Sequence, residues 1–101
     1  MSNEPLGTEI AGLQAQVYPG MFDEEVQATI KVGGREITVV TSLDDVVLET
    51  PRPSDSGSPG KLKVYLVDAT EDSFLVDLPG EALGTTKRVK VERGAVSRVA
   101  Q

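Results

Sequence analysis

The segment ATIKVGGREITVV, residues 28–40, decides the fold class, because two runs of alternating apolar and polar residues flank a Gly-Gly pair. Glycine at both turn positions permits the positive φ angles that a type I′ hairpin turn requires. With this turn, four pairs of residues lie opposite each other: Ala28 with Val39, Ile30 with Ile37, Thr29 with Thr38, and Lys31 with Glu36. The apolar pairs predict a buried face. The threonine pair and an expected Lys31–Glu36 ion pair predict a face in solvent.

A second hairpin is predicted over residues 61–78, KLKVYLVDATEDSFLVDL, with a three-residue loop at residues 70–72. Its register places three pairs opposite each other: Val64 with Leu78, Leu66 with Val76, and Tyr65 with Asp77. Val67 then faces Leu75 on the outer side of the hairpin. We expect the wall of a barrel, the loop at residues 50–60 or a partner to cover these two side chains.

Two shorter elements follow the hairpins. The segment KRVKVER, residues 87–93, predicts a strand with Val89 and Val91 facing inward. The segment SLDDVV, residues 42–47, predicts a single helical turn. Ser42 caps this turn, and Asp45, three residues on, complements its exposed amide groups.

The domain organisation follows from how composition changes along the chain. Residues 1–9 predict a flexible tail, residues 10–101 predict a single β domain, and residues 50–60 predict a flexible loop rich in proline, glycine and serine. Residues 8–18 fit both a strand and one face of a helix, and their exit through Pro19-Gly20 favours the strand. Sliding the chain against itself by 52 residues superposes apolar positions of the two halves. Either the halves are duplicated three-stranded meanders, or two alternating segments match by chance.

The predicted fold is therefore all-β, a small antiparallel barrel of five or six strands, with a two-sheet β-sandwich as the alternative. The layout resembles an SH3-like barrel in strand number, size and the long loop. This resemblance implies an architecture only. The aromatic peptide groove of SH3 domains, with its tryptophan, has no counterpart because the chain has no tryptophan, so no functional residue is carried over.

Composition excludes several classes of function. The 101 residues contain no cysteine and no histidine, so a disulfide framework, a thiolate nucleophile, a serine–histidine pair and a cysteine-ligated zinc site are ruled out. The acidic clusters lack the spacing of a calcium loop. We therefore expect a protein that is not an enzyme and holds no cofactor and no metal. The chain shows no secretory pattern and no apolar run of about 20 residues, so we expect it in the cytoplasm, away from membranes.

The uneven charge of the chain points to its candidate binding surface. The net charge is −6, with 5 Lys/Arg against 15 Asp/Glu in residues 1–86 and 5 against 1 in residues 87–101. The first hypothesis is an interaction or assembly module that binds a protein partner, or itself, through a strand edge or an apolar strip. The second is a nucleic-acid- or ribosome-associated barrel with an aromatic among basic residues. Seven residues make up the predicted surface: Lys61, Lys63, Tyr65, Val67, Leu75, Arg88 and Lys90.

Overall fold

The computed structural model describes residues 9–98, which form nine β-strands and two single turns of 3-10 helix. The strands are β1 (Glu9–Pro19), β2 (Glu25–Val32), β3 (Arg35–Ser42), β4 (Val46–Leu48), β5 (Ser58–Ala69), β6 (Ser73–Asp77), β7 (Glu81–Leu83), β8 (Arg88–Glu92) and β9 (Val96–Arg98). The turns η2 (Leu43–Asp45) and η3 (Arg93–Ala95) precede β4 and β9. No α-helix occurs in the described range, as predicted.

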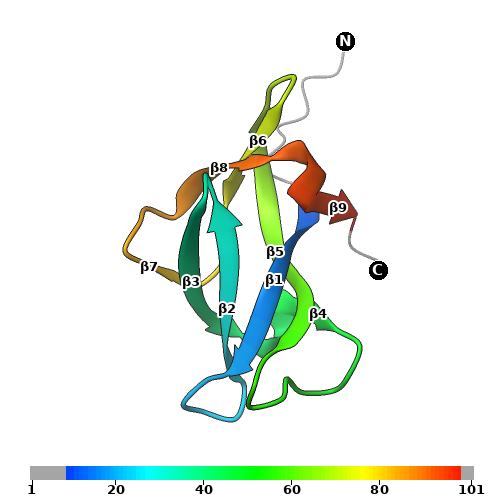
Figure 1. The fold of residues 1–101 in the computed structure, drawn as a ribbon, viewed down its shortest axis with the longest axis vertical. Helices are drawn as coiled ribbons and strands as arrows, with labels where there is room; N and C mark the ends of the chain where they lie inside the picture. Colours follow the sequence, from blue (N-terminus) through cyan, green and yellow to red (C-terminus); the bar gives the residue numbers. More distant parts are fainter. Residues whose placement is uncertain (1–8, 99–101) are drawn as a thin grey trace.

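One antiparallel sheet contains all these strands and curls into a half-barrel (Figure 1). Its main path runs β7-β3-β2-β1-β5-β6-β8, with β4 added to β5 and β9 added to β1. The continuous sheet replaces the two separate sheets of the sandwich alternative. Residues 9–98 hold more strands than the five or six predicted. The additional ones, β4, β7 and β9, have three residues each, too few for an alternating pattern to identify them.

The concave face of the sheet holds a single hydrophobic core. Alternate residues of each long strand point inward, as the two-residue period of a strand requires. The largest fully buried side chains are Leu13, Val17, Val26, Ile30, Val39, Leu62, Val64, Val76 and Leu78. The residues between them point outward, so the outer face of the sheet is where binding residues have to be sought.

The first hairpin has the predicted register and turn. The four predicted pairs lie opposite each other between β2 and β3. Gly33 and Gly34 have φ angles of 58° and 81°, a region that residues with a side chain rarely occupy. Lys31 and Glu36 face each other but do not close the predicted ion pair, so the turn and the apolar pairs hold this hairpin.

The second hairpin corrects one predicted pairing. Tyr65 lies opposite Asp77 as predicted, but a β-bulge at Val67 shifts the register, so Leu75 faces Asp68. The physical reason is the two-residue period of a strand. Without the extra residue, Asp68 would point into the core. With it, Asp68 stays exposed in solvent.

Two predicted segments have different bounds in the structure: the loop at residues 50–60, and the tail at residues 1–9, whose last residue, Glu9, belongs to β1. The loop predicted at residues 50–60 ends earlier, because β5 begins at Ser58 and pairs with β1 from that residue onward. Pairing along a whole strand edge outweighs the weak strand preference of Pro59 and Gly60. Residues 8–18 fall in strand β1 from Glu9 onward, as favoured. The predicted tail, residues 1–9, lies outside the described residues apart from Glu9.

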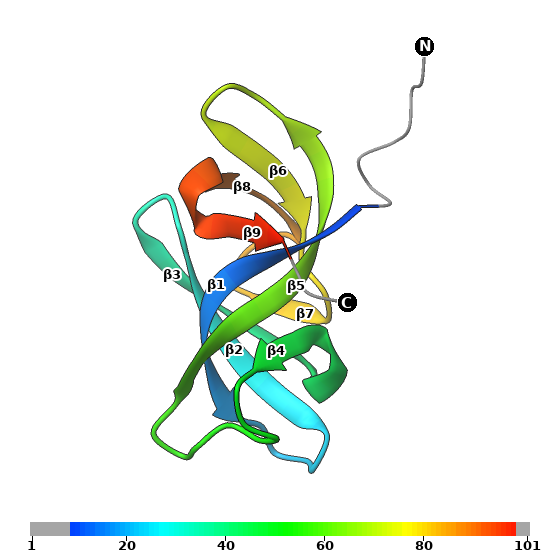
Figure 2. The same ribbon diagram turned by 90° about the vertical axis from the view of Figure 1, so that its right-hand side faces the viewer.

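Two halves of the chain have the same order of elements: three strands, a 3-10 turn and a short strand. The first is β1-β2-β3-η2-β4, and the second is β5-β6-β8-η3-β9, with β7 inserted. β4 pairs with β5 and β9 pairs with β1, so each half ends on the first strand of the other (Figure 2). The amide of Leu43 donates to the carbonyl of Glu24, and that of Arg93 to the carbonyl of Asp72. These equivalent residues are 50 and 48 positions apart, fewer than the 52 of the sequence alignment.

Candidate interaction surfaces

The predicted basic residues of β5 share the outer face of the sheet. Leu62, Val64 and Leu66 are buried, so the alternate residues Lys61, Lys63 and Tyr65 point outward. On β8, Val89 and Val91 are buried in the same way. Arg88 and Lys90 therefore also point outward.

Tyr65 lies in a row of four residues across four strands. It faces Ile10 of β1 on one side and Asp77 of β6 on the other, and Asp77 in turn faces Arg88 of β8. The side chains of Ile10 and Tyr65 are 41% and 44% exposed. Two large apolar groups thus lie side by side in solvent, and we call this pair the Ile10–Tyr65 strip.

An ion pair closes the other end of this row. Arg88 donates from Nε to Asp77 Oδ1 at 2.7 Å and from Nη2 to Asp77 Oδ2 at 3.1 Å. The hydrogen bond from Arg88, together with its positive charge, lowers the pKa of the Asp77 carboxyl below its ordinary value. Arg88 is thereby engaged within the protein, which leaves Lys63 and Lys90 as the cations beside the strip.

The remaining predicted residues lie on either side of this row. Leu75 faces Lys90 across β6 and β8, and Leu75 and Val67 are both half-buried. Lys61 faces Gln14 of β1 and Val47 of β4, away from Leu75. The structure therefore groups five of the other six predicted residues with Tyr65, and Lys61 belongs to a neighbouring groove.

This groove has a volume of about 920 Å³ and runs over the outer face of β1 and β2 between β4 and η3. Its charged lining residues are of both signs: Lys31, Lys61, Glu36 and Glu49. Every buried side-chain nitrogen or oxygen within residues 9–98 already has a hydrogen-bond partner. The groove consequently has neither a net charge nor an unpartnered buried group with which to select a ligand.

The free edges of the sheet carry features that oppose pairing with another chain. Strand β7, at one end of the main path, has only three residues. Strand β8, at the other end, alternates buried valines with the charged residues Arg88, Lys90 and Glu92. Short edge strands and charged side chains are common protection against edge-to-edge association.

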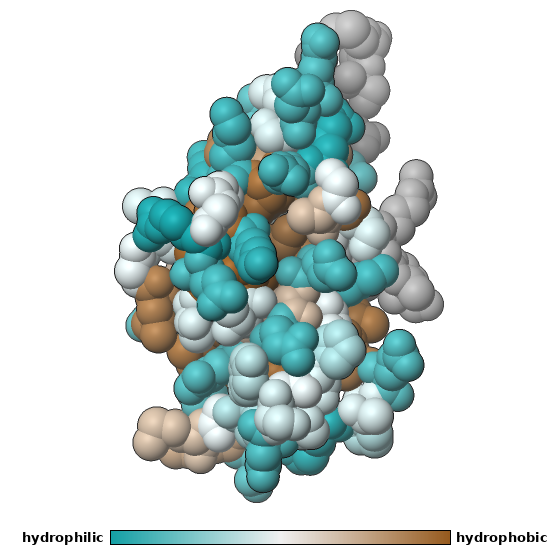
Figure 3. All heavy atoms as spheres, viewed as in Figure 1, coloured by the Kyte–Doolittle hydropathy of each residue, from teal (hydrophilic) through white to brown (hydrophobic). Residues whose placement is uncertain are grey.

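A second exposed apolar site lies at the connection between β1 and β2. The side chains of Met21 and Phe22 are 84% and 72% exposed, the highest values among the large hydrophobic residues in the described part of the chain. Figure 3 shows the apolar colour of this connection projecting at the lower left, where Figure 1 places the loop. We call residues 20–24 the β1–β2 loop.

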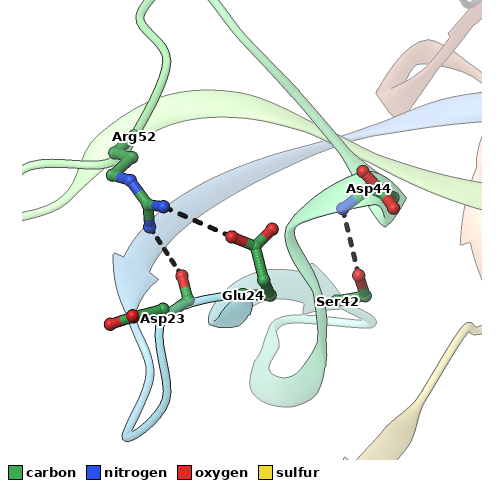
Figure 4. A network of polar contacts seen from close by, with 5 residues as sticks. All are labelled: Asp23, Glu24, Ser42, Asp44 and Arg52. Atoms are coloured by element: carbon green, nitrogen blue, oxygen red, sulfur yellow. Dashed lines mark hydrogen bonds and ion pairs between the residues drawn. The ribbon is translucent and has the colours of Figure 1, made fainter.

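Hydrogen bonds fix the shape of the β1–β2 loop. The amide of Met21 donates to Glu25 Oε1 at 2.8 Å, and the amide of Glu25 donates to the carbonyl of Phe22 at 3.0 Å. Arg52, from the connection between β4 and β5, donates to the carbonyl of Asp23 at 2.6 Å and pairs with Glu24 at 3.3 Å (Figure 4). Two separate segments thus hold Met21 and Phe22 at the end of the molecule.

The next segment of the first half is also anchored near this loop. Ser42 Oγ accepts the amide of Asp44 at 3.2 Å, which confirms the predicted cap (Figure 4). Asp45 lies in the first turn, as expected, and accepts a hydrogen bond from the hydroxyl of Thr41. The amide of Leu43 donates to the carbonyl of Glu24, so this turn lies beside the β1–β2 loop. The carboxylates of Asp23, Glu24 and Asp44 consequently lie at the same end of the molecule (Figure 4).

Met21, Phe22 and Arg52 are not among the residues predicted from the sequence. The available signal was MF, residues 21 and 22, between the turn-forming Pro19-Gly20 and a run of three carboxylates. Apolar residues in such a turn have no inward face to occupy, so they indicate exposure. Arg52 gave no signal, because it lies 29 positions from Asp23.

No group of three or more carboxylate, histidine or cysteine side chains in residues 9–98 is arranged to hold a metal ion. That same range contains no helix with the length and apolarity needed to cross a bilayer. Function has to be inferred from the surfaces described above, since no protein-family model, curated protein or solved structure matches the chain.

Proposed function

We propose that the protein is a non-catalytic interaction or assembly module that binds a protein partner through the Ile10–Tyr65 strip. The observation that carries the proposal is the pairing of these two side chains, 41% and 44% exposed, on an outer sheet face. Half-buried Leu75 extends the apolar area, and Lys63 and Lys90 border it. An aromatic centre with a polar rim is the usual composition of a protein–protein interface.

The strip supports this proposal better than a strand edge does. Binding by strand addition requires an accessible row of unpaired amides and carbonyls. The charged alternation of β8 and the shortness of β7 both oppose it. We therefore choose the outer face of β5 and β6 over the sheet edge.

A second candidate function is binding of nucleic acid or association with the ribosome. It is favoured by the outward direction of Lys63 and Lys90 near an exposed tyrosine, on which a base can stack, with Lys61 on the same face in the neighbouring groove. It is opposed by the net charge of −6 and by the Arg88–Asp77 pair, which occupies one of the predicted cations. The protein-binding candidate is therefore placed first.

For the fold, we propose an SH3-like layout. It is supported by the order of elements at the end of the described range, where a 3-10 turn leads into β9 and β9 pairs with the first strand. The proposal concerns architecture and transfers no binding residue.

The test compares Tyr65→Ser with Leu83→Ser as a matched control. Leu83 is 52% exposed on β7, outside the strip. Each variant and the wild type serve as bait in quantitative affinity capture, and fluorescence anisotropy measures binding to single-stranded RNA at low and high salt. We expect partners held by wild type and Leu83→Ser to be lost with Tyr65→Ser, with little dependence on salt.

Two outcomes would contradict the first candidate. One is a partner set that Tyr65→Ser retains in full. The other is RNA affinity that falls steeply as salt rises and disappears in the double variant Arg88→Ala, Lys90→Ala, since binding to phosphates releases counterions. The second outcome would establish the nucleic-acid candidate in its place.

A further inference from the structure

We propose that the Ile10–Tyr65 strip binds the β1–β2 loop of a second copy of this chain, so that molecules associate head to tail. This inference rests on the proposed function, because it names the partner of the same strip. The inserting residues are Met21 and Phe22, and the receiving residues are Ile10 and Tyr65.

Comparison of the two halves of the fold indicates that a connection shorter than the one containing Met21 and Phe22 can make the contact with the following 3-10 turn. The equivalent connection of the second half, between β5 and β6, spans only Thr70, Glu71 and Asp72, whereas the β1–β2 loop spans five residues. Both connections make the same hydrogen bond to the following 3-10 turn. The first half therefore has two more residues than this structural role needs, and its loop carries two large exposed apolar side chains.

The β1–β2 loop is ordered before any partner binds. Arg52 donates to the carbonyl of Asp23, and Glu25 accepts the amide of Met21. A loop that is already fixed loses less conformational entropy on association than a mobile one. The structure thus presents Phe22 as an anchor that can enter an apolar site without first being ordered.

Charge complementarity points to a copy of this chain as the partner. The carboxylates of Asp23, Glu24 and Asp55 lie in or beside the loop. Among the described residues around the loop, Arg52 is the one cation. The border of the strip has a net positive charge, because Lys63 and Lys90 outnumber the exposed Asp68, and Asp77 is paired with Arg88. An acidic apolar projection and a basic apolar strip thus occur on one molecule.

The two surfaces cannot meet within one molecule. Ile10 is at the start of β1 and the loop follows its end, so about ten residues of strand, roughly 30 Å, separate them. Figure 1 shows the loop at the lower end of the sheet and the β5–β6 hairpin at the upper end. The contact joins two different patches, so its head-to-tail repetition produces open chains or closed rings, whereas two reciprocal contacts between the same two molecules would stop at a dimer.

The expected association is weak, because two apolar side chains and a few charges bury less than the roughly 1,200 Å² of a standard interface. Sedimentation velocity from about 10 µM to 1 mM is the suitable measurement. For the wild type, we expect the weight-average sedimentation coefficient to increase with concentration beyond the value of a dimer.

The decisive experiment mixes two variants. Phe22→Ser removes the loop anchor and Tyr65→Ser removes the strip, so neither variant should associate alone over this range. An equimolar mixture keeps one intact loop and one intact strip, and we expect it to form a dimer and nothing larger. Leu83→Ser should associate as the wild type does. Far-ultraviolet circular dichroism of each variant checks that the fold is retained.

Three outcomes would overturn the inference: a wild type that stays monomeric at 1 mM, association that survives in Phe22→Ser, or a mixture that remains monomeric. The proposed function fails separately. If the wild type is monomeric but Tyr65→Ser still loses a captured partner, the strip binds another protein and only the head-to-tail contact is wrong. If Tyr65→Ser loses neither a captured partner nor self-association, both the proposed function and the head-to-tail contact are wrong.

Discussion

At Asp77 one carboxylate joins two strands of the outer face. It accepts two hydrogen bonds from Arg88 and lies opposite Tyr65 in the register. The side chains of Asp77 and Arg88 are 31% and 55% exposed, so solvent screens their attraction and the pair stabilises the fold only modestly. Its larger effect is on the surface, because it removes one charge of each sign from the border of the Ile10–Tyr65 strip.

The Asp77–Arg88 pair predicts a pH dependence of stability. Hydrogen bonding to Arg88 lowers the pKa of Asp77 in the folded state, whereas in the unfolded chain an aspartate titrates near about 3.9. The stability from the ionised carboxyl is therefore fully present above the unfolded pKa and is lost as pH falls through the folded pKa. In urea unfolding from pH 7 to pH 2, the difference in stability between wild type and Asp77→Asn should stay constant above about pH 5 and decrease below it. A difference independent of pH would show that the pair does not form in solution.

Among the elements, β7 depends on a glycine at its start. Gly80 has a φ of 61°, and a Cβ atom there would lie 2.2 Å from the carbonyl oxygen of Val40 on β3. Strand β7 pairs with β3 through three residues only. The close approach at Gly80 is therefore what allows so short a strand to join the sheet.

Gly80→Ala and Gly84→Ala form a matched pair for testing this packing. Gly84 also has a positive φ, 78°, but a Cβ atom added there would have open space for 4 Å around it. We expect Gly84→Ala to lower the free energy of unfolding by about 1–2 kcal/mol through backbone strain alone. Gly80→Ala adds a steric clash, for a total of roughly 2–5 kcal/mol. Equal losses in chemical denaturation would mean that β7 does not pack closely on β3.

For the whole molecule, local pattern predicted the long strands, the register of the first hairpin, and that of the second hairpin as far as its bulge. Gly33-Gly34 defined the first hairpin because turn and pairing are encoded within 13 residues. The bulge at Val67 was not predictable, since keeping Asp68 out of the core is a consequence of tertiary packing. The predicted residues around Tyr65 do share a face, because strand alternation fixes direction. The exposure of the β1–β2 loop was indicated by its apolar residues in a turn, but its support by Arg52 was not predictable because Arg52 comes from a distant segment.

Because the last strand of each half pairs with the first strand of the other, we expect that neither half can fold without the other. In a chain cut between Pro53 and Ser54, the first fragment would contain β4 without β5, and the second would contain β9 without β1. Each fragment alone should be unfolded by circular dichroism, and an equimolar mixture should recover the β signal of the intact chain. A fragment that folds alone would contradict this expectation. During synthesis, then, the first half has no stable structure to adopt until β5 has left the ribosome.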